Sequence, residues 1–474
     1  MSPPADLRAR VLDAALASAS GLALWWLCDR HGLADRILPS GYIAADFVDY
    51  CRGLLWMDGA DVRWPERRYP AAALPAWMLT HGGGLVEGLR DAASLCTMLL
   101  GAALYLWARV AHGRLAGLLA IACACTMAPL VLLPRMLSFY PAMVAGTAFG
   151  AAAAMVGLTG PEGRRIGWVG LGAGLVLLLD GRGIVWAAPW LLCGVLAVLL
   201  TPGPRARRLA WLLAPVLGSW FVAGALDPGG LLSFEAQVDV RPLYHAAGST
   251  NPAHGPPWAD GGAFVWGRSM PWALVDTAGF LFQQLSLEPP EGWDAQVGRF
   301  DAAARLRPLH RALLVGVLLA IPGLLVTRRR RHALALAVTA GPYALTLLLQ
   351  GEQAELFARL LAGSLPGACV LLGVGLAASS ELAASGLDRL WPARRWLPGA
   401  VMLSLGVLVP TGLVPTPVGP DAGWRRPWPR VSELDRVHPD RPVGVSLPAD
   451  TATCAAALDA DAAAGRWMPA LPRR

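Results

Sequence analysis

The sequence predicts an all-α, polytopic membrane protein with about eleven transmembrane helices. Of its 474 residues, 55% are hydrophobic and only 15% are charged, whereas a soluble domain averages about 25% charged residues. Apolar runs long enough to span a bilayer recur along the chain, and arginines gather in the short connections between them. Most of the surface is therefore expected to face lipid, and one helical bundle is expected rather than two or three soluble domains.

The apolar runs predict the individual spans. The first run follows a short basic start and so resembles a secretory signal peptide, but the many later spans favour a retained first helix. The predicted spans are residues 11–28, 93–110, 115–133, 141–159, 166–180, 184–200, 209–226, 311–327, 333–349, 357–377 and 397–414.

The charges of the short connections predict the orientation. Arginine clusters fall on one side of the membrane, and the positive-inside rule makes that side cytoplasmic. The N-terminus is then cytoplasmic and the C-terminus extracytoplasmic, in a membrane that we expect to be a bacterial inner or plasma membrane. The clusters are Arg8/Arg10, Arg109/Arg114, Arg164/Arg165, Arg205/Arg207/Arg208, Arg328–Arg331 and Arg389/Arg394/Arg395.

Three long segments are predicted on the outer side. Two of them contain apolar stretches too short or too mixed to span, Ala72–Leu79 and Met270–Leu287, which we expect to be helices in the interface plane. The predicted organisation is a membrane domain, 1–414, with outer loops 29–91 and 227–310, and a short tail, 415–474.

The net charge of +7 arises without lysine, so all 40 basic residues other than histidine are arginine. Because these arginines lie in short loops, they indicate topology and contact with membrane lipid rather than a nucleic-acid partner. The eight cysteines have no zinc or disulfide spacing, and no nucleotide-binding, serine-hydrolase or zinc-protease motif occurs. We therefore expect no cofactor.

The first outer loop has the densest set of polar side chains. Asp46 and Asp49 are three positions apart, so on a helix they would share a face. Two carboxylates there could supply a general base, or bind a cation or a hydroxyl-rich ligand. The alternative is a solvated loop in which both residues cap helices, and residue chemistry alone favours that alternative.

Several short motifs occur in order along the chain. They are Asp46-Phe47 with Tyr50, Leu54-Leu55 with Gly59, Tyr69-Pro70-Ala71, Leu89-Arg90-Asp91, Tyr105-Leu-Trp-Ala-Arg109, and Phe357-Ala-Arg359 with Pro366. In order, spacing and topology they resemble the GT-C superfamily of membrane glycosyltransferases, in particular its polyprenyl- and dolichyl-phosphate-mannose-dependent mannosyltransferases. The sequence departs from that pattern at Ala71, where the family has Pro, and at Leu360, where it has Tyr. The resemblance covers residues 10–200 well and 310–414 loosely.

The resemblance implies roles for individual residues. Asp46, with Asp49 beside it, would be the catalytic carboxylate that takes the proton of the acceptor hydroxyl. Inverting transfer from a sugar phosphate needs such a base on the face opposite the leaving group. The leaving phosphate is an anion, which arginine binds through two parallel hydrogen bonds. The candidates for this donor-phosphate partner are Arg182, Arg359 and Arg135.

These arginines also have structural interpretations. Arg182 could pair with Asp180 in the tight turn between two spans, and Arg359 could be an interfacial arginine in an ordinary ion pair. Residues 134–141 include Arg135 but none of the acidic residues that some family members have there, so we expect no essential metal.

The acceptor side is predicted from aromatic and histidine residues. Tyr50 and Tyr69 belong to the motifs of the first outer loop, and His245 and His254 lie in the second, near Trp258. Together they could line a substrate site in which tryptophan faces stack on sugar. The alternative is a polar, Pro- and Gly-rich surface loop.

These observations favour a glycosyltransferase that moves a sugar from a polyprenyl-phosphate donor to a glycan, lipid or protein acceptor at the extracytoplasmic face. One alternative is a catalytically silent GT-C-like scaffold, which would tolerate loss of Asp46. Another is a lipid or solute transporter, which would need polar or broken helices near the midplane. The sugar, the acceptor, the prenyl length and the oligomeric state are not determined by the sequence.

Overall fold

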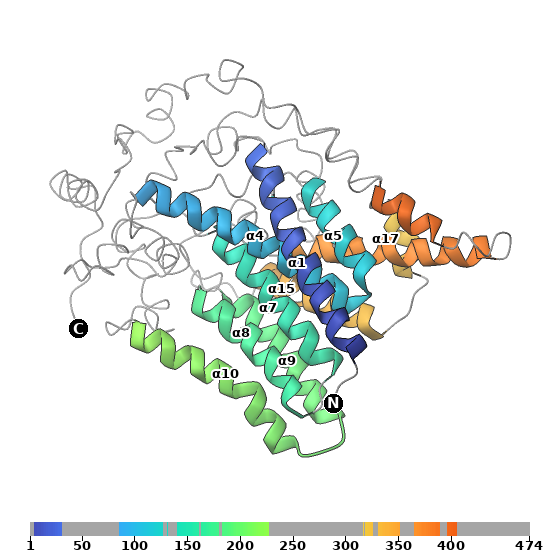
Figure 1. Cartoon of the computed structure of the whole chain (residues 1–474). Coiled ribbons are helices and arrows are strands. Elements are labelled where there is room, and N and C mark those ends of the chain that lie inside the picture. Colours follow the sequence, from blue (N-terminus) through green and yellow to red (C-terminus); the bar gives the residue numbers. More distant parts are fainter. Residues whose placement is uncertain are drawn as a thin grey trace.

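A computed structural model describes residues 4–30, 85–126, 130, 140–160, 163–179, 183–226, 316, 318–325, 330–350, 365–388 and 396–404. Nearly all of these residues are helical, and no strand occurs among them (Figure 1). Four helices contain segments long and apolar enough to cross a membrane, namely Leu7–Cys28, Asp91–Ala111, Pro141–Thr159 and Leu365–Leu387. The fold is therefore the all-α polytopic bundle that the sequence predicts.

Most helices begin and end close to the predicted spans. Helix α7 (Tyr140–Thr159) lies within one residue of the prediction 141–159, and α9 (Ile184–Leu200) has the predicted bounds. Helical turns at 318–325 and 397–404 lie inside two further predicted spans. The remaining elements are α1 (Pro4–Arg30), α4 (Leu85–Ala111), α5 (Arg114–Thr126), the 3-10 helix η2 (Gly163–Ile166), α8 (Gly167–Leu179), α10 (Arg205–Leu226), α15 (Arg330–Gln350) and α17 (Leu365–Asp388).

The tenth span differs from its prediction. It was expected at 357–377, whereas α17 (Leu365–Asp388) continues past the predicted end to Asp388. Residues 357–364 lie outside the described part of the chain. The stretch after residue 377 contains serines and a glutamate, which end a hydropathy window, but its alanines and leucines are strong helix formers. Ser380 also donates its hydroxyl to the carbonyl of Ala377, 2.7 Å away, within the helix. The polar residues therefore made the hydropathy-based prediction stop at 377, whereas the helix-forming residues around them let α17 continue.

Small residues let neighbouring helices approach closely. A Cβ atom on Gly101 of α4 would lie 2.7 Å from the carbonyl oxygen of Ser20 on α1. Helix α8 likewise turns Gly167, Gly170 and Gly174 toward α10. Because lipid tails are as apolar as leucine, such packing is a main source of helix association in membranes. These contacts fix α1 against α4 and α8 against α10.

A serine of α17 holds the helical segment 318–325. The Ser379 hydroxyl donates to the carbonyl of Leu319 at 2.7 Å and accepts the backbone N–H of Gly323 at 2.9 Å. In a regular helix these two backbone groups bond to each other, but Pro322 lies between them, and prolines and inserted side chains are the usual causes of helix kinks. The hydroxyl satisfies both backbone groups, as an apolar environment requires.

The bundle has two chemically different ends. In Figure 1 the N-terminus lies at the same end as the connection between α9 and α10. This end, which we call the basic end, includes Asp13, Arg109, Arg114, Arg165 and Arg208. At the opposite end, which we call the loop end, α1 finishes, α4 and α7 begin, and α8 is followed by α9.

Candidate functional site

None of the predicted site residues falls within the described part of the chain. The structure describes the helices that precede and follow these residues. The roles of the site residues stay predictions. The residues concerned are Asp46, Asp49, Tyr50, Tyr69, Arg135, Arg182, His245, His254 and Arg359. The predicted interfacial helices and the tail, 415–474, also lie outside the described residues.

Helices α1 and α4 frame the first outer loop. They are antiparallel neighbours, since Gly21 of α1 faces Met98 of α4 and Gly101 faces Ser20. The end of α1 and the start of α4 therefore lie at the same end of the bundle. Helix α4 begins at Leu85, so about its first two turns extend into the segment 29–91 that was predicted as loop. The chain between Arg30 and Leu85, which includes Asp46, joins the bundle at the loop end.

The connection from α8 to α9 is tight where it re-enters the bundle. A Cβ atom on Gly183 would lie 2.5 Å from the carbonyl carbon of Val176, one turn before the end of α8. Only glycine allows so close an approach of two backbones. Helix α7 packs against α8 here, with Gly146 facing Leu179. The residues between Leu179 and Gly183, Arg182 among them, thus connect two helix ends at the loop end.

Helix α17 runs from the loop side toward the basic end. A Cβ atom on Gly373 would lie 2.8 Å from the Cα of Ala120 on α5. Eight residues further on, the Oε1 of Glu381 lies 3.1 Å from the Nε2 of His112, just after α4. The first residue of α17, Leu365, therefore faces the loop side. The segment before it contains Arg359.

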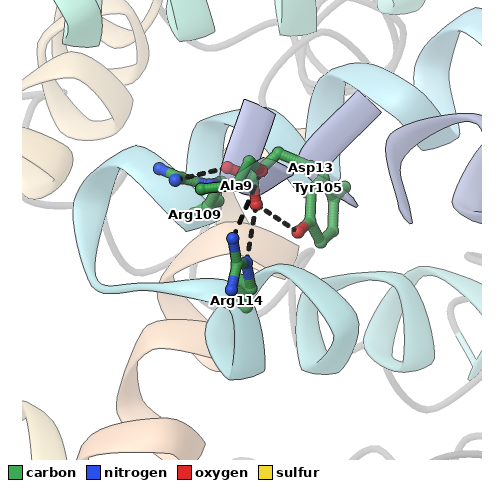
Figure 2. Close-up of polar contacts among 5 residues, drawn as sticks. All are labelled: Ala9, Asp13, Tyr105, Arg109 and Arg114. Carbon is green, nitrogen blue, oxygen red and sulfur yellow. Dashed lines mark hydrogen bonds and ion pairs between the residues drawn. The ribbon is translucent and has the colours of Figure 1, made fainter. Parts of the chain in front are cut away.

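The described ionisable cluster lies at the basic end instead. Figure 2 shows the carboxylate of Asp13 between two guanidinium groups. The Nε of Arg114 donates to Asp13 Oδ1 at 2.8 Å, Arg109 forms an ion pair with Oδ2, and the Tyr105 hydroxyl donates to Oδ1 at 3.3 Å. Arg114 also donates to the carbonyl of Ala9 at 3.2 Å. One carboxylate thereby joins α1, α4 and α5.

This cluster stabilises the packing of α1 against α4 and α5. The Asp13 side chain is 12% exposed, while those of Arg109 and Arg114 are 35% and 41% exposed. Two cations on one anion leave a net positive charge at the rim of the bundle, where headgroups and water can solvate it. From sequence, Arg109 and Arg114 were assigned to a cytoplasmic arginine cluster and Asp13 was not singled out, although an ionisable residue in an apolar run requires a partner.

The described residues also bear on metal binding. Across the ranges that the structure describes, no three His, Cys, Asp or Glu side chains gather as metal ligands would. The cysteines in those ranges are mostly buried. The expectation of no essential metal stays a prediction, since the outer loops hold the relevant carboxylates.

Comparisons with known proteins give two similar solved structures. No family model and no curated protein matches the sequence. ArnT from Cupriavidus metallidurans, solved bound to undecaprenyl phosphate, matches 86% of this chain over 73% of its own, with 12% identity and a TM-score of 0.44. The oligosaccharyltransferase of Archaeoglobus fulgidus, solved in the apo form, matches 78% of this chain over 51% of its own, with 13% identity and a TM-score of 0.37.

Proposed function

We propose that this chain is a GT-C-type glycosyltransferase that moves a sugar from a polyprenyl-phosphate donor to an acceptor at the extracytoplasmic face. Asp46 is the general base, and an arginine, Arg182 or Arg359, binds the donor phosphate. In this proposal the basic end is cytoplasmic, as the positive-inside rule requires, and the loop end is extracytoplasmic.

One observation carries the proposal furthest: the segments that hold these residues join the bundle on one side. The segment with Asp46 follows α1, the segment with Arg182 connects α8 to α9, and the segment with Arg359 precedes α17. The antiparallel contacts of α1 with α4 and of α7 with α8 put the corresponding helix ends together. Residues far apart in sequence therefore have the opportunity to form one site.

In the proposed reaction, Asp46 accepts the proton and polyprenyl phosphate is the leaving group. The acceptor hydroxyl oxygen attacks the anomeric carbon of the sugar while the Asp46 carboxylate takes its proton. The bond between that carbon and the phosphate oxygen breaks, and polyprenyl phosphate leaves as an anion. Because attack and departure occur on opposite faces of the ring, the configuration inverts. An arginine guanidinium stabilises the leaving phosphate through charge-assisted hydrogen bonds, so no strong acid is needed.

The described interior disfavours the transport alternative. Within the described ranges, the buried residues with a formal charge are Asp13 and Arg208, and the buried imidazole of His112 faces Glu381; all of them lie at the basic end. A transporter places polar or ionisable groups near the bilayer midplane, where its substrate crosses. The buried hydroxyls of Thr97 and Thr147 donate to carbonyls of their own helices, and Ser20 is buried on α1. The remaining buried side chains of the described helices are mostly alanine, leucine, tryptophan and other apolar residues, as suits a scaffold for a site at one end.

The decisive experiment incubates the purified full chain with radiolabelled polyprenyl-phosphate sugars and a membrane extract. Transfer of label by the wild type and none by Asp46→Asn is the expected result, with Asp61→Asn as a matched control in the same loop. Both variants should insert and unfold as the wild type does. Full transfer by Asp46→Asn would remove Asp46 as the base, and no transfer by the wild type would favour the silent scaffold.

A further inference from the structure

Five arginines gather at the basic end between η2 and α10. Arg164 and Arg165 belong to η2, and Arg205, Arg207 and Arg208 belong to the first turn of α10, which contacts η2. The described residues from 140 to 226 include no Asp or Glu, and in the sequence the connection before η2 has a single carboxylate, Glu162. The arginines therefore greatly outnumber the acidic residues in this part of the chain.

Two of these arginines are held in place by contacts with the protein. Arg208 is buried, and its guanidinium donates to the carbonyls of Thr201 and Pro202 at 3.0 and 2.8 Å. It thus binds the carbonyl oxygens that follow α9, where a helix favours a cation. The guanidinium carbon of Arg164 lies 5.1 Å from the ring centre of Trp211, a cation–π contact that fixes it against α10.

The other arginines face solvent. Arg165, Arg205 and Arg207 are exposed, and within the described ranges none of the three has an ion pair. Exposed guanidinium groups without a carboxylate are ready donors for an anion, and their planar donor edge matches a phosphate in particular.

An exposed apolar surface continues directly from this cluster. On α8, the residue after Gly167 is Trp168, which is half exposed, and Leu171 follows on the same side. On α10, Leu217, Trp220 and Phe221 are exposed, the last by 75%. A tryptophan beside a basic cluster is the typical arrangement at the headgroup level of a membrane, with aliphatic and aromatic side chains toward the tails.

We propose that η2 and the first turn of α10 bind the phosphate of an anionic phospholipid, whose acyl chains lie along the exposed faces of α8 and α10. Arg165, Arg205 and Arg207 bind the phosphate, Arg164 is held beside them by Trp211, and Arg208 fixes the turn. A lipid fits better than a soluble anion because the cationic cluster and the apolar surface are adjacent. This site lies at the basic end and is independent of the sugar-transfer site.

The test uses the purified full chain with defined lipids. Native mass spectrometry in detergent measures the binding of phosphatidylglycerol and of phosphatidylcholine. We expect phosphatidylglycerol to bind more tightly, with a preference that declines as salt rises. Since one arginine near a membrane surface contributes about 1 kcal/mol toward anionic lipid, each loss should weaken binding about fivefold. The variant Arg165→Gln/Arg207→Gln should therefore lose most of the preference.

A matched variant separates this site from general charge. Arg8→Gln/Arg331→Gln also removes two exposed arginines at the basic end and should keep the preference. Equal losses in the two double variants would overturn the proposal, because any arginine at this end would then serve. Inorganic phosphate that displaces phosphatidylglycerol at equal concentration would overturn it as well, since the acyl chains would then add nothing.

Discussion

The indole Nε1 of Trp190 on α9 donates a hydrogen bond of 3.0 Å to the backbone carbonyl of Val338 on α15, 148 positions away in the sequence. Pro342 lies four residues after Val338, inside the same helix. Proline has no N–H, so the carbonyl four residues earlier loses its helical donor. Trp190 thus satisfies the acceptor that Pro342 leaves open, and the bond joins two helices.

Trp190→Phe should destabilise the protein, because it removes the donor while keeping most of the ring. A buried carbonyl left without a donor costs about 1–3 kcal/mol, which thermal unfolding of the purified chain would record as a lower midpoint. Trp186→Phe is the matched control. Trp186 is equally buried, one turn earlier on α9, but among the described residues its Nε1 has no hydrogen-bond partner. Equal losses in both variants would mean that ring size, rather than the hydrogen bond, matters.

Pro342→Ala should reduce the effect of the Trp190 substitution. Alanine restores a backbone N–H that can bond to the Val338 carbonyl, so Trp190→Phe should cost about 1 kcal/mol less in this background than in the wild type. The measurement is a double-mutant cycle of unfolding midpoints for the wild type, both single variants and the double variant. Strict additivity would show that Pro342 and Trp190 do not share this carbonyl.

The positions of helices were largely predictable, and the contacts between them were not. Helix α9 has its predicted bounds because a continuous apolar run between two turns defines it locally. The bond between Trp190 and Val338 depends on how α9 packs against α15, and no local pattern encodes that. The same holds for Asp13, whose partner Arg114 lies 101 positions away. Hydropathy located both residues near span ends without pairing them.

Asp13→Asn should destabilise the bundle more than either arginine substitution does. Without the carboxylate, Arg109 and Arg114 face each other across a half-buried site. Breaking such a pair costs about 2 kcal/mol here, between the values for buried and surface ion pairs. Thermal unfolding of Asp13→Asn, Arg109→Gln, Arg114→Gln and Asp13→Asn/Arg109→Gln tests this, since removal of one cation from the Asp13→Asn variant should recover part of the loss. If the double variant is less stable than Asp13→Asn, charge repulsion is not the cause.

The described residues nearest to the predicted site in the sequence belong to the helices that flank it. Motifs of the first loop and of the segment before α17 indicated which residues matter, and the chain direction of α1, α8 and α17 is compatible with their convergence. The distance between Asp46 and any arginine depends on long loops, whose paths neither hydropathy nor charge determines. Variants that change donor binding therefore test which arginine binds the donor phosphate, a question that the packing of the helices does not answer.

Arg359→Ala should weaken donor binding and leave folding nearly intact. A charge-assisted hydrogen bond contributes about 1.5–3 kcal/mol, so the KM for a polyprenyl-phosphate sugar should rise about tenfold or more. Arg359→Lys keeps the charge but cannot donate two parallel hydrogen bonds to the phosphate. Its KM should therefore lie between those of the alanine variant and the wild type. Arg182→Ala, measured in parallel, tells which arginine binds the phosphate. An unchanged KM with a lower unfolding midpoint would make Arg359 an interfacial anchor, because such a residue supports the bundle without touching the donor.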